Sequence, residues 1–141
     1  MKSKAPLTLV EQTVMILVFA LAAALCLRAF VWADGKSHDN AARDHALLCA
    51  QNAAETLKSC RGDNAAAAES CGGSWDGAVW VIRYDSGWSE SAGAKAYRLE
   101  VLPGEKRLAY LGEASVQVLD ASGELLTQLD VCWQEVGSHA G

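Results

Sequence analysis

The stretch PLTLVEQTVMILVFALAAALCLRAFVWADG, residues 6–35, is a long apolar run with one carboxylate, Glu11, near its front edge. The sixteen residues after it, 12–27, carry no charge, and the next charged residue is Arg28. A helix needs about 20 apolar residues to cross a hydrocarbon core about 30 Å thick. Residues 12–33 meet that length if the Arg28 side chain extends to the headgroups. The stretch therefore predicts a membrane-spanning helix.

Two other interpretations of this segment stay open. A secretory signal peptide begins with basic residues, here Lys2 and Lys4, and has an apolar centre of about 7–15 residues before a small-x-small cleavage site. The tripeptide VWA, residues 31–33, fits such a site and would release a protein that begins at Asp34. The apolar run is longer than that, and Arg28 interrupts it. A plain anchor satisfies the length, and the basic start then places the N-terminus in the cytoplasm.

Neither the signal peptide nor the plain anchor gives Glu11 a function. A carboxylate at membrane depth is energetically costly and by default marks a functional position. A free α-amino group of a neighbouring chain would match it, because the pair neutralises both charges where an unpaired ion is unfavourable. The simpler alternative is that the side chain reaches water at the membrane edge.

The segment LTLVEQTVMILVFALAAAL, residues 7–25, resembles the N-terminal signature of type IV pilins and of the pseudopilins of type II secretion and competence systems. In that family a short basic leader precedes a hydrophobic segment with Thr at the second mature position and Glu at the fifth. Aligned in this way, residues 1–6 are the leader, Leu7 is the first mature residue, Thr8 the second and Glu11 the fifth.

The resemblance implies that a prepilin peptidase cuts between Pro6 and Leu7, that the new terminus is N-methylated, and that an inner-membrane platform assembles the chain with other pilin or pseudopilin subunits. Residues 7–33 would form the transmembrane and filament-core helix, in which Glu11 meets the amino terminus of the adjacent subunit. Residues 34–141 would form an extracytoplasmic head in a periplasmic or extracellular filament. Pro6 departs from the family, which usually has Gly there, and its ring stiffens the peptide. This departure and the short head favour a minor subunit.

Charge and motif content argue against several other functions. The chain has a net charge of −5; residues 1–33 carry +2, which leaves −7 for residues 34–141. An acidic head without clustered Lys and Arg does not fit a nucleic-acid surface. His45 and Cys49 have the i, i+4 spacing of metal ligands, but no second pair accompanies them. No nucleophile with a base and no phosphate-binding loop is recognisable. We therefore expect no enzyme, no cofactor and no metal site.

Periodicity predicts an α+β head. An apolar stripe at spacings of three and four indicates a helix over about residues 38–61. Its members are Ala42, Ala46, Cys49, Ala53, Leu57 and Cys60. Gly35 and Ser37 are expected to loosen the junction with the spanning helix, and residues 61–77 are expected to form a loop.

Alternating patterns then predict a small antiparallel sheet of about four strands over about residues 78–136. The clearest strands lie in the segments 77–87, 95–104 and 114–137, and segment 107–112 is a strand or a connector. Residues 120–124, DASGE, are a predicted turn. The resulting fold is a long N-terminal helix packed on an antiparallel sheet, which is also what the resemblance implies. Trp88 lies in a polar loop and is expected to fold back on the sheet, the alternative being a contact for another subunit or ligand.

Four cysteines lie beyond the apolar segment, and Cys26 lies inside it. An even number of cysteines in an exported segment suggests one or two disulfides. Cys60 and Cys71 flank a short loop of small residues and are the easiest pair to close. Cys49 and Cys132 are weaker candidates, and the sequence does not choose among the three possible complete pairings.

Overall fold

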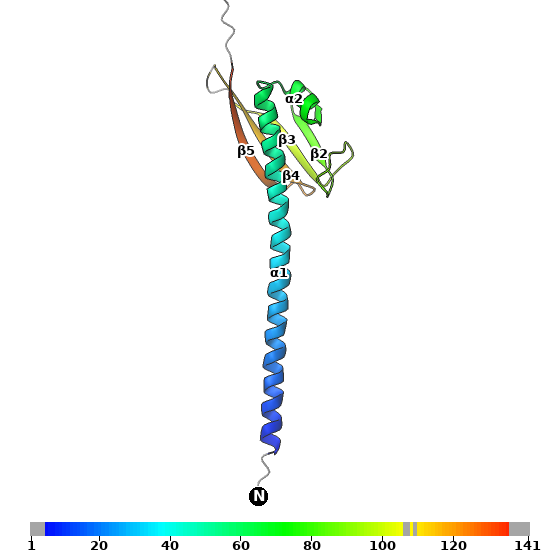
Figure 1. Ribbon diagram of the computed structural model, residues 1–141, viewed down its shortest axis with the longest axis vertical. Helices are drawn as coiled ribbons and strands as arrows, with labels where there is room; N and C mark the ends of the chain where they lie inside the picture. Colours follow the sequence, from blue (N-terminus) through cyan, green and yellow to red (C-terminus); the bar gives the residue numbers. More distant parts are fainter. Residues whose placement is uncertain (1–4, 106–107, 109, 136–141) are drawn as a thin grey trace, which may run out of the picture. The chain divides into compact units, whose positions relative to one another are not determined.

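The computed structural model describes residues 5–105, 108 and 110–135. The chain divides into an N-terminal unit, residues 1–40, and a C-terminal unit, residues 41–141. In chain order the elements are α1 (Ala5–Ser59), α2 (Asn64–Cys71), β1 (Ser74–Trp75), β2 (Trp80–Tyr84), β3 (Tyr97–Pro103), β4 (Leu111–Asp120) and β5 (Leu125–Gln134) (Figure 1). α1 contributes to both units, and the other elements belong to the C-terminal unit.

The N-terminal unit is helical from Ala5 onward. Its sequence is rich in Leu and Ala, which favour helix formation. Pro6 stands in the first turn, where its missing amide hydrogen would have had no helical acceptor. The helix continues through Gly35, so the loosened junction expected there is not present in the backbone. Four residues of the expected leader, 1–4, lie outside the described residues.

A short turn joins α1 to α2. Gly62 has φ +83°, a left-handed conformation that glycine adopts without a Cβ clash, and its amide donates to the carbonyl of Leu57 at 2.9 Å. The Asp63 carboxylate accepts hydrogen bonds from the amides of Ala65 (3.0 Å) and Ala66 (3.2 Å) and so caps α2. The expectation of a continuous loop over residues 61–77 is therefore wrong, because a capping aspartate before a run of four alanines favours a helix.

The sheet contains five antiparallel strands, each paired with the next in the order β1-β2-β3-β4-β5. The register aligns one residue from each of four strands in a line across the sheet. Trp80 lies opposite Val101, Val101 opposite Val116, and Val116 opposite Leu129. Because opposite residues in antiparallel strands share a face, this line places apolar side chains on one side. The predicted α+β fold is confirmed, with β1 as an additional short edge strand.

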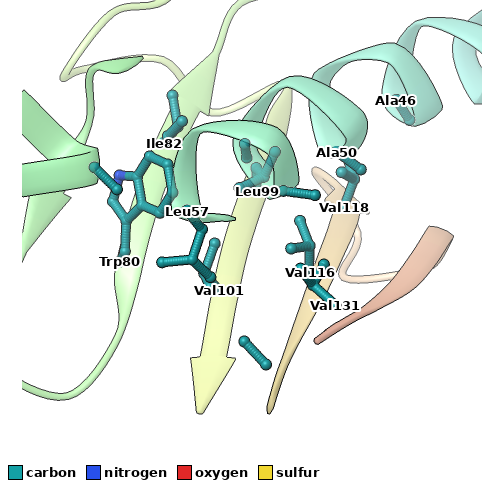
Figure 2. Packing of buried hydrophobic residues seen from close by; sticks show 14 residues of the cluster. Ala46, Ala50, Leu57, Trp80, Ile82, Leu99, Val101, Val116, Val118 and Val131 are labelled. Carbon is teal, nitrogen blue, oxygen red and sulfur yellow. The ribbon is translucent and has the colours of Figure 1, made fainter. Parts of the chain in front are cut away.

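The hydrophobic core lies between that face of the sheet and the last turns of α1. Figure 2 shows Leu57 of α1 beside Trp80 and Val101. Ala46 and Ala50 lie on the same side of the helix, over the strands. The core consists of Ala46, Ala50, Ala53, Ala54, Leu57, Ala67, Trp80, Ile82, Leu99, Val101, Ala114, Val116, Val118 and Val131. Ala46, Ala53 and Leu57 of the predicted apolar stripe are fully buried, so the stripe does face the core.

Candidate functional site: the apolar helix and the cysteine and aromatic clusters

The N-terminal part of α1 presents apolar side chains on all its faces. Every residue from Pro6 to Asn40 is exposed, and Leu7, Phe19 and Phe30 are 79%, 77% and 72% exposed. The most apolar 18-residue window of α1 has a mean hydropathy of 2.6, and none of that window is buried. α1 is thus one helix that is long and apolar enough to cross a membrane. A surface of this extent is typical of a segment that is covered by lipid or by other helices.

The residues of the predicted processing and assembly site lie in the first two turns of this helix. Pro6 and Leu7 belong to the first turn, and Glu11 lies one turn after Leu7, on the same side of the helix. The Glu11 side chain is exposed. Nearby, the Thr13 hydroxyl donates to the carbonyl of Leu9 at 2.8 Å, so this polar side chain is satisfied within the helix itself.

The cysteines do not pair as expected. All five are free thiols, and none stands at bonding distance from another. The disulfide that loop length favours, between Cys60 and Cys71, is not formed. Cys71 is the last residue of α2, which replaces the flexible loop expected between the two cysteines. Cys132 is exposed on the polar face of β5, as its alternation predicted, and Cys26 is exposed in the N-terminal unit.

Cys49 and Cys71 instead converge on Tyr84. Both thiols are half-buried and pack against the core. Burial raises the pKa of Cys49, which a hydrogen bond with the Tyr84 side chain partly offsets, and the proximity of Cys71 raises it further. The pKa of Tyr84 is also raised, first by burial and then by the neighbouring Cys49. Sequence patterns do not indicate this cluster, because its three members lie on three different elements.

A second cluster surrounds Trp88, in the loop between β2 and β3. Its indole ring stacks on Tyr97, with ring centroids 4.0 Å apart, and faces His45 of α1 at 5.7 Å. Tyr84 lies against it at 5.9 Å in a tilted arrangement. Trp88 adopts φ +63°, which is unusual for a bulky residue. The expectation that Trp88 folds back onto the sheet is confirmed, and this cluster ties the loop to α1.

The opposite face of the sheet carries several charged side chains on β2 and β3. Arg98 pairs with Glu100 through Nε and Oε1 at 2.9 Å, and Arg83 stands opposite Arg98 in the register of β2 and β3. These arginines and Lys95 line a surface hollow of about 380 Å³ that also contains Asp120. Within the β4–β5 turn, the Asp120 carboxylate accepts hydrogen bonds from the amides of Ser122 and Glu124. All three cationic side chains are solvated, so the hollow has the character of ordinary surface.

Within the described ranges, no group of three or more His, Cys, Asp or Glu side chains could hold a metal ion. Of the histidines, His45 is used in ring stacking, and His139 lies outside the described residues. Comparison with protein-family models, with curated proteins and with solved structures gives no match for this chain.

Proposed function

We propose that this chain is a pilin-like or pseudopilin-like structural subunit, and a minor one, that acts through assembly and protein–protein contacts and not as an enzyme. One observation carries the proposal. The helix that begins the chain exposes all its large apolar side chains between Leu7 and Trp32, and its single acid in that span is Glu11. The same helix then continues into the C-terminal unit, where it is part of the core.

A helix that is apolar on every side is stable only where apolar neighbours surround it. Lipid supplies such neighbours before assembly, and the helices of other pilin or pseudopilin subunits supply them afterwards. Ala20 and the run at residues 22–24 offer small surfaces that allow helices to approach closely. Glu11 would then accept the α-amino group of an adjacent subunit, because that pairing removes an isolated charge from an apolar environment.

This role implies a sequence of steps for the chain. It inserts once into the membrane with its N-terminus in the cytoplasm, and a prepilin peptidase processes it between Pro6 and Leu7. N-methylation and transfer to an assembly platform come next, and the filament serves a pilus, a type II secretion system or a competence system. The C-terminal unit is then extracytoplasmic.

A second candidate function is a single-pass anchored binding domain that does not polymerise. Pro6 favours it, because a proline beside the cut stiffens the peptide that a peptidase must accommodate. Lipid alone then covers the apolar helix, and Glu11 reaches the headgroup region.

The substitution Glu11→Ala separates the two functions. For a filament subunit we expect loss of co-purification with the other filament proteins, while membrane insertion stays intact. The matched control is Gln12→Ala, which removes a neighbouring polar side chain without removing a charge and should leave assembly unchanged. Normal assembly of the Glu11→Ala variant would contradict the proposal, whereas an anchored domain tolerates the change.

Processing is tested independently by intact mass and N-terminal sequencing of the protein from its native membranes. A chain that begins at Leu7 with an added methyl group supports the filament subunit. A chain that retains Met1 supports the permanent anchor, and one that begins at Asp34 shows that the apolar segment was a signal peptide.

A further inference from the structure

The strand β5 forms one edge of the sheet, and among the described residues no strand pairs with its outer side (Figure 1). It is ten residues long and contains no Pro, Lys or Arg. Soluble proteins usually place such residues on an edge strand or keep it short, because an open edge accepts further strands. The opposite edge follows this rule, since β1 has only two residues. The β5 edge is therefore the exposed one.

Every second residue of β5 directs its backbone amide and carbonyl away from the sheet. The amide of Glu135 donates to the carbonyl of Tyr110 at 2.9 Å, so these two residues form a hydrogen-bonded pair just beyond the strands. Such pairs alternate along antiparallel strands, and the register with β4 is continuous over residues 127–134. The odd-numbered residues of this range therefore bond to β4. The outward-facing residues are Gln128, Asp130, Cys132 and Gln134, and all four are exposed.

A hollow lies beside this edge, between β5 and the helix that covers the sheet. Its volume is about 370 Å³, and it is lined by residues between 51 and 58 of α1 and by residues 129–131 of β5. Ala54, Leu129 and Val131 are its apolar lining residues. A strand added to β5 would direct alternate side chains to this side of the sheet. The hollow accommodates small apolar side chains there.

A second hollow, of about 320 Å³, is lined by residues 104–105, 113–115 and 130–132. The register sets Glu113 opposite Cys132 and Ser115 opposite Asp130, so these side chains share the face that α1 does not cover. The carboxylates of Glu105, Glu113 and Asp130 line this hollow, and none of its described lining residues is Lys or Arg. The other alternate side chains of an added strand would therefore meet negative charge.

We propose that the β5 edge binds an extended segment of another polypeptide as a further antiparallel strand, and that this segment alternates basic with small apolar side chains. Its residues opposite Asp130 and Cys132 have side chains on the acidic face, so the basic residues stand there. A second copy of β5 is a poorer partner, because it would bring another Asp130 carboxylate to the same face. The proposal does not rest on the filament role.

The probe is a synthetic peptide of about eight residues in which lysine alternates with valine and threonine. It is added to the full-length protein in non-ionic detergent, and amide hydrogen exchange is followed by NMR. In the free protein we expect slow exchange at Leu129 and Val131 and fast exchange at Asp130 and Cys132. The peptide should slow exchange at Asp130 and Cys132 by at least about tenfold. No binding at about 1 mM peptide, or binding without this protection, would overturn the proposal.

A modified peptide separates backbone pairing from charge. The lysines pair with the outward-facing residues of β5, so their amides make the bonds to the edge. Methylating the lysine amides removes these bonds while keeping the charge, and it should abolish the protection. Equal binding of the two peptides would refute strand addition. Protection of the same amides without peptide, in a concentration-dependent dimer, would show that a second copy occupies the edge and would also overturn the proposed partner.

Two variants of the protein test the acidic face. Asp130→Asn should weaken peptide binding about threefold, because it removes the charge opposite a lysine. Glu69→Gln is the matched control, since Glu69 is an exposed acid on α2 and should leave the affinity unchanged. Equal losses in the two variants would assign the binding to the overall negative charge of the protein and contradict a site at β5.

Discussion

The indole ring of Trp88 lies parallel to the phenol ring of Tyr97, with an angle of 8° between the planes and 4.0 Å between the centroids. The same indole also stacks with His45 at 5.7 Å, so it contacts both a strand of the sheet and the helix that covers it. The β2–β3 loop is therefore held to both layers of the C-terminal unit by one side chain.

We expect Trp88→Ala to lower the free energy of unfolding by about 2 kcal/mol, less than for a fully buried aromatic residue because Trp88 is half-buried. Urea unfolding of the full chain in detergent, monitored by circular dichroism, measures the change. Trp32→Ala is the control, since Trp32 is 70% exposed in the N-terminal unit. An equal effect of both substitutions would show that the stacking adds nothing to stability.

Two leucines on α1 allow a matched test of the core. Leu57 is fully buried, while Leu48 is 56% exposed on the same helix. We expect Leu57→Ala to cost about 3 kcal/mol of unfolding free energy, because it removes apolar contacts and leaves a cavity. Leu48→Ala should change it by less than about 0.5 kcal/mol. Similar denaturation midpoints for the two variants would contradict the assignment of the buried stripe.

The turn between α1 and α2 should be sensitive to one added methyl group. A Cβ at Gly62 would meet the indole ring of Trp133, and Gly62 has φ +83°. Gly123 has φ +86° in open space, so Gly123→Ala carries the backbone strain alone. We expect Gly62→Ala to destabilise the fold by at least about 1 kcal/mol more than Gly123→Ala does. Chemical unfolding of both variants measures the difference, and equal losses would mean that Trp133 simply moves aside.

The β4–β5 turn should lose a stabilising charge in acid. Hydrogen bonds from the Ser122 side chain and then from the amide of Glu124 lower the pKa of Asp120. A depressed pKa in the folded state stabilises the protein above the usual aspartate range, and that contribution disappears as pH falls through the folded value. Asp120→Asn should therefore be less stable than the parent at pH 7, and the difference should shrink as pH falls below the usual aspartate range. Unfolding curves over this range provide the test, and a difference that stays constant with pH would contradict it.

The helix and the strands are predictable from the sequence because their patterns are local. The spacing of Ala46, Ala53 and Leu57 is that of one helix face, and all three are buried. Alternation likewise places Cys132 outward and Val131 inward on β5, as the structure has them. These predictions need only the geometry of a single element.

The features that the sequence does not predict depend on the packing of helices and strands against one another. The sequence does not predict α2 because its run of alanines shows no periodic alternation of apolar and polar residues. Asp63 is nevertheless a recognisable N-cap residue. Loop length favours the pairing of Cys60 with Cys71. In the structure Cys71 instead contributes to the raised pKa of Cys49, and this relation depends on the packing of separate elements, which loop length does not reveal.

All the buried core residues in the described part of the chain lie at Ala46 or later. Every residue from 6 to 40 is exposed, so the apolar side chains of this segment are available to lipid or to other helices. As a filament subunit, the chain would exchange lipid for neighbouring helices along this segment, while the buried core keeps its own contacts. In the proposed function, the position of this segment in lipid or in a filament then depends on which apolar neighbours are available to it.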